Sequence, residues 1–125
     1  MKIRFTVTYP KVDRSSYPEP QRDWQAVMDF PTTATPQERC DILFAGMGNH
    51  PYMTFPWHRF NQTRSMSVGD VVRFGTAPTC FICDSCGWLE VSLAMANSWL
   101  AYRRQYGCDM FELSQWKKAA GLAGR

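Results

Sequence analysis

The sequence has no apolar run long enough to cross a membrane, and it has few of the side chains from which enzymes build active sites. Of its 125 residues, two are histidine and 20% are charged. A membrane-spanning helix needs about 20 consecutive apolar residues, and the N-terminal segment MKIRFTVTYP alternates instead of forming the apolar centre of a signal peptide. We therefore expect a cytoplasmic protein with no membrane partner, whose five cysteines stay reduced.

Recognisable catalytic and cofactor-binding motifs are also missing. The chain contains no phosphate-binding loop, no glycine-rich dinucleotide fingerprint, no paired-carboxylate motif and no nucleophile elbow. The net charge of +3 is too small to indicate nucleic-acid binding unless the positive charge is concentrated in one patch. These absences favour a protein without enzymatic activity and without a cofactor.

The length and the apolar content of 45% favour a single domain over residues 1–125. Apolar residues alternate with polar ones from Lys2 to Tyr9 and again from Trp24 to Phe30, which predicts two strands joined as a hairpin. Runs of β-forming residues separated by turn residues follow from Ser67. They predict a three-stranded antiparallel meander over residues 71–74, 79–84 and 88–91.

Three segments have the pattern of helices. The run Thr35-Pro36-Gln37-Glu38 predicts a capping box with proline in the first turn. Ser92 is expected to begin a second helix that ends at about Tyr106, and a short third helix is expected from Asp109 to Gly121. The whole pattern predicts an α+β fold: a single antiparallel or mixed sheet of about five strands with two or three packed helices. The expected common core is Phe44, Trp88, Trp99 and Leu100.

Cys80, Cys83 and Cys86 form the pattern C-x2-C-x2-C, which makes them weak candidates for a metal site. Structural zinc is bound by four ligands, and no second C-x2-C pair is present. On an extended strand Cys80 and Cys83 point to opposite faces, because their separation is odd. We therefore expect no metal. A redox pair of Cys83 and Cys86 normally opens a helix, so a small Cys-dependent redox protein or enzyme is a less favoured alternative.

Two parts of the chain are candidate partner-binding surfaces. The segment from Asn49 to Asn61 concentrates aromatic residues and an arginine, the types that dominate protein interfaces. Residues 91–125 carry five basic and two acidic side chains, which suits an acidic partner. The alternatives are an aromatic segment packed on the core and an ordinary solvated helix face. The candidate residues are Tyr52, Trp57, His58, Arg59, Phe60, Arg64, Arg103 and Arg104.

Two linked segments, RSMSVGDVV at residues 64–72 and FICDSCGW at residues 81–88, resemble the YodL-like family. The resemblance covers residues 64–91, and Cys86 stands where the family often has an aromatic residue. Turn chemistry explains much of this pattern, because Asp and Ser side chains bond nearby amides and Gly adopts left-handed backbone conformations. Ser67, Asp70, Asp84, Ser85 and Gly87 are expected in these roles.

The resemblance implies a context and no reaction. YodL-like domains occur in phages, plasmids and other mobile elements, beside antirestriction domains. The resemblance therefore implies a non-enzymatic phage or mobile-element protein that acts in the host cytoplasm. We expect it to bind and inhibit a host defence protein or nucleoprotein complex, of the Cas or restriction type. The main alternative is an accessory protein that binds nucleic acid.

Overall fold

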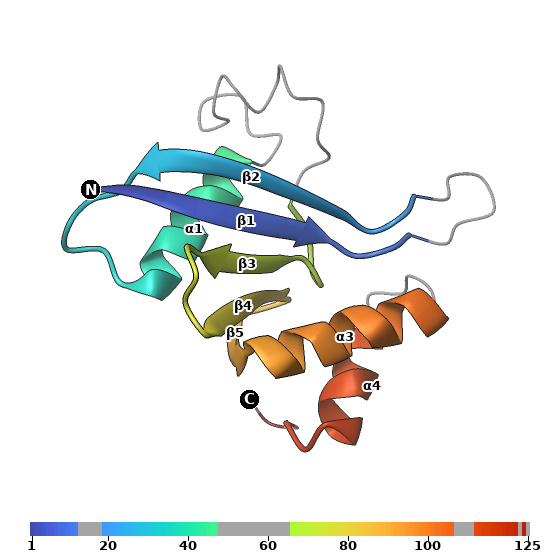
Figure 1. Ribbon diagram of the computed structural model, residues 1–125. Helices are drawn as coiled ribbons and strands as arrows, with labels where there is room; N and C mark the ends of the chain where they lie inside the picture. The colour runs from blue at the N-terminus through green and yellow to red at the C-terminus, as the bar shows by residue number, and fades with distance from the viewer. Residues whose placement is uncertain (13–18, 48–65, 107–111, 123, 125) are drawn as a thin grey trace.

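The computed structural model describes residues 1–12, 19–47, 66–106, 112–122 and 124, and it contains one five-stranded sheet with helices on both faces (Figure 1). All neighbouring strands are antiparallel, in the order β2-β1-β3-β4-β5. The α+β fold and the five strands predicted from the sequence are confirmed. The strands are Lys2–Tyr9 (β1), Arg22–Asp29 (β2), Val71–Phe74 (β3), Thr79–Asp84 (β4) and Gly87–Ser92 (β5).

The N-terminal hairpin pairs β1 with β2 over the full length of both strands, with Lys2 opposite Asp29 and Tyr9 opposite Arg22. The alternation in β1 has the predicted result, because Phe5 and the two alternate residues after it are buried on one face. β2 begins two residues earlier than the sequence pattern indicates. It also forms one edge of the sheet, at the top of Figure 1.

The meander of β3, β4 and β5 is also confirmed. Its second turn is closed by Asp84, whose carboxylate accepts a hydrogen bond from the Ser85 amide at 2.7 Å. Gly87 follows with a φ of +98°, a conformation that residues with a side chain rarely adopt. The turn chemistry expected for this segment therefore accounts for these three residues.

Three helices lie in the described part of the chain: Pro36–Gly46 (α1), Leu93–Tyr106 (α3) and Glu112–Ala119 (α4). The predicted capping box is present, because the Glu38 amide donates to Thr35 Oγ1 and the Thr35 amide donates to Glu38 Oε1. Ser92 caps α3 by accepting a hydrogen bond from the Met95 amide at 3.2 Å. None of the described helices is long and apolar enough to span a bilayer.

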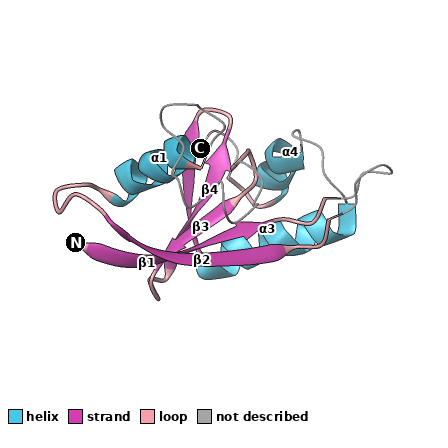
Figure 2. Ribbon diagram, turned by 90° about the horizontal axis from the view of Figure 1, so that it is seen from above, coloured by secondary structure: helices cyan, strands magenta, loops and turns pink. Residues whose placement is uncertain are grey.

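The helices form two layers, with α1 on one face of the sheet and α3 and α4 on the other (Figure 2). The expected common core is therefore wrong. Phe44 and Trp88 lie on the α1 side, where their rings meet edge to face at 6.4 Å and Phe44 stays 44% exposed. Trp99 and Leu100 are buried on the other side. The sheet separates the two pairs, because successive strand residues point to opposite faces.

Candidate binding surface

The predicted partner-binding residues divide into two groups. Tyr52, Trp57, His58, Arg59, Phe60 and Arg64 lie outside the residues that the structure describes, so their candidacy stays a prediction. Arg103 and Arg104 lie in the last turn of α3. The structure gives these two arginines different environments.

The sequence predicted that Arg103 contacts a partner. Arg103 is instead buried, with 7% of its surface exposed, so a docking partner cannot reach it. Its guanidinium lies over the Trp99 ring, 5.4 Å from the ring centroid. Its Nε is 3.4 Å from Oε2 of Glu112 at the start of α4, and its Nη2 donates to the Lys11 carbonyl oxygen at 3.2 Å. Arg103 is buried because α4 packs beside this face of α3 and places the Glu112 carboxylate next to the guanidinium.

The same cluster explains a glycine of the segment that resembles the YodL-like family. Trp99 Nε1 donates a hydrogen bond of 2.8 Å to the carbonyl oxygen of Gly69. A Cβ at Gly69 would lie 2.8 Å from Arg103 Nη1 and 3.1 Å from the Trp99 ring. Gly69 also has a φ of +97°. The position therefore requires glycine for both packing and backbone reasons.

Arg104 is exposed, and its Nη1 donates to Gln21 Oε1 at 2.8 Å. This contact joins the end of α3 to the residue that precedes β2. Lys118 is also exposed, whereas Lys117 is largely covered by its contact with Asp84. The positive charge counted in the C-terminal part of the sequence is thus partly neutralised inside the protein.

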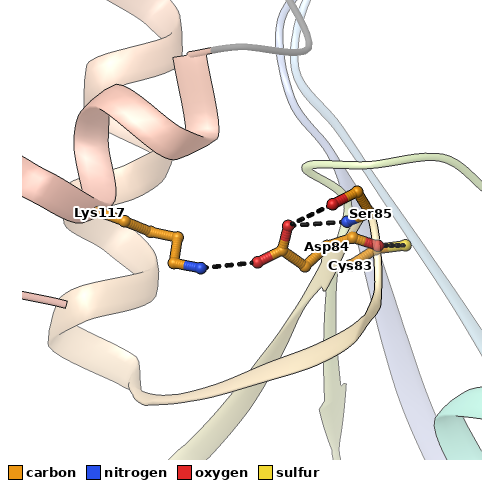
Figure 3. A network of polar contacts seen from close by, with 4 residues as sticks. All are labelled: Cys83, Asp84, Ser85 and Lys117. Atoms are coloured by element: carbon orange, nitrogen blue, oxygen red, sulfur yellow. Dashed lines mark hydrogen bonds and ion pairs between the residues drawn. The ribbon is translucent and has the colours of Figure 1, made fainter. Parts of the chain in front are cut away.

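A polar network ties the β4–β5 turn to α4 (Figure 3). Lys117 Nζ lies 2.9 Å from Asp84 Oδ2, while Asp84 Oδ1 accepts from the Ser85 amide. Partial burial opposes ionisation of Asp84, but the bonds from Lys117 and Ser85 outweigh it and lower the pKa of its carboxyl. The side chains of Asp84 and Lys117 are mostly covered, with exposed fractions of 22% and 14% respectively. This network holds the turn against the helix.

Asp70 closes the turn before β3, as expected. Its Oδ2 accepts a hydrogen bond from the Ser67 amide at 2.8 Å, and its own amide donates to the Ser67 carbonyl oxygen at 3.1 Å. The Asp70 side chain is fully buried. The polar residues of this segment therefore stabilise the fold. Their hydrogen bonds account for the pattern without a ligand.

The cysteines are divided between the two faces of the sheet. Cys80 belongs to the core under α3, whereas Cys83 pairs across the strands with Trp88, which packs on the α1 side. The predicted opposite directions of these two thiols are confirmed. Burial raises the pKa of Cys83 to about 12, and it also raises the pKa of Cys40 and of Cys80 above the usual value. Three thiols are therefore protonated near neutral pH.

The hydrogen-bonding pattern of the hairpin determines which residues of β2 direct their backbone N–H and C=O groups away from β1. Met1 and Phe30 exchange two backbone hydrogen bonds, of 2.9 and 3.0 Å. The Arg4 carbonyl oxygen accepts from Gly75, at the end of β3. Because hydrogen-bonding directions alternate along a strand, the odd-numbered residues of β1 bond to β2. Their partners are the even-numbered residues of β2, so the odd-numbered residues direct their N–H and C=O groups outward.

These outward groups belong to Asp23, Gln25, Val27 and Asp29, all of which have exposed side chains. Val27 is 54% exposed. Within the described ranges, β2 pairs with β1 alone. The alternation of polar and apolar residues predicts the strand, but its edge position was not predicted, because alternation carries no information about neighbouring strands.

The comparisons with known proteins add no relative. No family model matches the chain. No curated protein and no solved structure matches it either. The resemblance of residues 64–91 to the YodL-like family therefore stays a prediction.

Proposed function

We propose that this protein is a non-enzymatic binding protein that inhibits a host defence complex, of the Cas or restriction type, by covering a surface that the complex needs. The observation that supports a binding function is the outer edge of β2, which pairs with no strand in the part of the chain that the structure describes. β2 is a full strand whose outward backbone groups belong to residues with exposed side chains. Open edges pair readily with other chains. The target class rests on the resemblance of residues 64–91 to proteins of mobile elements.

The state of the cysteines supports binding over thiol chemistry. A nucleophilic or redox-active cysteine needs an accessible thiolate, which a lowered pKa supplies. Cys40, Cys80 and Cys83 are buried, and their pKa values are raised. Cys86 is exposed at the β4–β5 turn and does not begin a helix. The redox alternative is therefore the least favoured.

The neutralised charges favour a protein target over nucleic acid. Arg103 and Lys117 are each held beside a carboxylate, of Glu112 and Asp84 respectively. Nucleic-acid affinity depends on cations that reach phosphates. A salt titration of binding to duplex DNA and to RNA tests this comparison: we expect weak binding, and a tight complex with a steep salt dependence would favour the accessory-protein alternative.

The mechanism of inhibition is tested with purified complexes. The protein is added at increasing molar ratios to a Cas effector complex and to a restriction complex, and cleavage of target DNA is measured. If the protein inhibits by covering a surface of the complex, inhibition should saturate near one protein per binding site and should not increase with incubation time. Progressive inhibition by a small fraction of that amount would show turnover and would overturn the non-enzymatic proposal. No inhibition of either complex would overturn the target class.

The aromatic segment is tested in the same assay. Trp57→Ala combined with Arg59→Ala is expected to weaken inhibition by at least about tenfold if these side chains contact the target, equivalent to about 1.4 kcal/mol. Circular dichroism and the unfolding temperature report whether the variant is folded. A folded variant that inhibits normally would remove these residues from the candidate list.

A further inference from the structure

Among the described residues, β2 shows few of the features that usually protect an edge strand. Natural edge strands are often shortened, bulged or interrupted by proline. β2 is eight residues long, contains no proline and keeps an unbroken register with β1. Its centre, from Trp24 to Met28, carries no charged side chain. This edge is therefore able to accept another strand.

β1 shows which polar side chains pair with β2. At one end of the hairpin Lys2 lies opposite Asp29, whose carboxylate forms an ion pair with the N-terminal ammonium of Met1. At the other end Thr8 lies opposite Asp23. Thr8 Oγ1 donates a hydrogen bond of 2.7 Å to Asp23 Oδ1. Both carboxylates are on the exposed face of the strand. An added strand with a basic residue opposite Asp29 and a hydrogen-bond donor opposite Asp23 would complement these two carboxylates.

β1 also shows the apolar complement. On the α1 side, Phe5 lies opposite Ala26, and its ring meets that of Trp24 edge to face at 5.8 Å. Trp24, Ala26 and Met28 are half-buried. Apolar side chains on the same face of an added strand would cover the rest of their surface. The free edge therefore favours an amphipathic strand with the alternation of β1.

A second copy of the chain fits this edge poorly. When two β2 strands pair antiparallel, residues that face the same side lie opposite one another. One central register places Asp23 opposite Asp29, which opposes like charges. The neighbouring register places Arg22 opposite Met28 and Asp23 opposite Val27, which pairs charges with apolar side chains. Other registers leave more of each strand unpaired.

We propose that the outer edge of β2 binds an extended segment of a different protein, which adds antiparallel to β2 as a further strand of the sheet. The segment carries a basic residue opposite Asp29, a hydrogen-bond donor opposite Asp23, and apolar residues on the α1 side. Such strand addition combines main-chain hydrogen bonds with side-chain selection. This inference rests on the binding function proposed above and names its surface.

The probe is a fluorescein-labelled peptide with the sequence KIRFTVTY of β1, compared with a peptide in which glutamate replaces both basic residues. Fluorescence anisotropy measures the binding of each to the full chain. We expect saturable binding of the basic peptide and binding at least about tenfold weaker for the acidic one. Equal binding of the two, or no binding of the basic peptide, would overturn the proposal.

The Val27→Pro variant tests whether the peptide binds at the β2 edge and not at another surface of the protein. The Val27 amide points outward, so proline removes no hydrogen bond between β1 and β2 but blocks the added strand. The matched control is Val27→Thr, which keeps the amide and the preference for strand structure. We expect Val27→Pro to weaken binding of the basic peptide at least about tenfold relative to Val27→Thr. Equal binding by the two folded variants would contradict the proposal.

Hydrogen exchange in the unmodified protein tests the same point without a variant. The basic peptide should slow exchange of the Gln25 and Val27 amides by at least about tenfold. Unchanged exchange would overturn the proposal, and so would a homodimer that Val27→Pro converts to monomer. These assays contain no defence complex. Their failure removes this surface, whereas failure of the cleavage assay removes the proposed target.

Discussion

Arg103 of α3 and Glu112 of α4 form an ion pair inside the protein, with 3.4 Å between Nε and Oε2 and side chains only 8% and 11% exposed. Removal of one partner from a buried pair leaves the other charge without compensation, which typically costs about 3–5 kcal/mol. We expect Glu112→Ala to lower the free energy of unfolding by about 3 kcal/mol, measured by urea denaturation.

The control is the double variant Arg103→Met with Glu112→Leu, which replaces both charges with apolar groups. A buried pair exchanged in this way often loses little stability. We expect the double variant to be more stable than Glu112→Ala. A double variant that is the less stable of the two would show that the ion pair itself, and not the uncompensated charge, determines stability here.

Gly69 and Gly87 form a matched pair for testing the packing at the first turn. Their φ angles are +97° and +98°, a range that residues with a side chain rarely adopt, so alanine is strained at both positions. Only at Gly69 would the new Cβ press on Arg103, at 2.8 Å, because Gly87 has open space around it. We expect Gly87→Ala to cost about 1 kcal/mol and Gly69→Ala about 1–3 kcal/mol more. Thermal unfolding of both variants measures the difference, and equal losses would contradict the clash.

Trp99 and Phe44 should differ sharply in their contribution to stability. Trp99 is fully buried and its ring lies 5.6 Å from that of Trp116, whereas Phe44 is 44% exposed. We expect Trp99→Ala to cost about 3–5 kcal/mol and Phe44→Ala about 1 kcal/mol. Urea denaturation measures both. A loss of similar size at the two positions would mean that Phe44 is enclosed after all.

The sequence predicted the elements well and their arrangement in space less well. Local signals, such as the capping box at Thr35 and the positive φ at Gly87, depend on a few neighbouring residues and were confirmed. The split of Phe44 and Trp99 between two cores depends on which face each helix covers, and periodicity does not contain that information. The burial of Arg103 likewise depends on Glu112, a neighbour only in the folded chain.

The candidate site was harder to predict for the same reason. A sheet edge is a property of strand order, and nothing in the alternation of Trp24 to Phe30 shows that β2 has one neighbouring strand among the described residues. The charge count of the C-terminal part was correct, but it did not show that Arg103 and Lys117 are used inside the protein. Both errors come from contacts between residues far apart in the chain.

The Asp84–Lys117 contact should make stability depend on acid pH. The folded pKa of Asp84 lies below its usual value of 3.8, so the unfolded chain takes up the proton first as the pH falls. The stabilisation is therefore present above about pH 4 and is lost as the pH falls through the folded pKa. We expect Lys117→Met to cost about 1 kcal/mol near pH 7 and less near pH 3. In the Asp84→Asn background the effect of Lys117→Met should not vary over this range.

The cysteines should label at very different rates in the native protein. Cys86 is exposed, whereas Cys40, Cys80 and Cys83 are buried and have raised pKa values, about 12 for Cys83. Maleimide and similar reagents attack the accessible thiolate, so Cys86 should react at least about a hundredfold faster than Cys83 near pH 7. Mass spectrometry of proteolytic peptides resolves each site, and labelling in guanidinium chloride should make the rates similar. Rapid native labelling of Cys83 would show an activated thiol and would support the redox alternative.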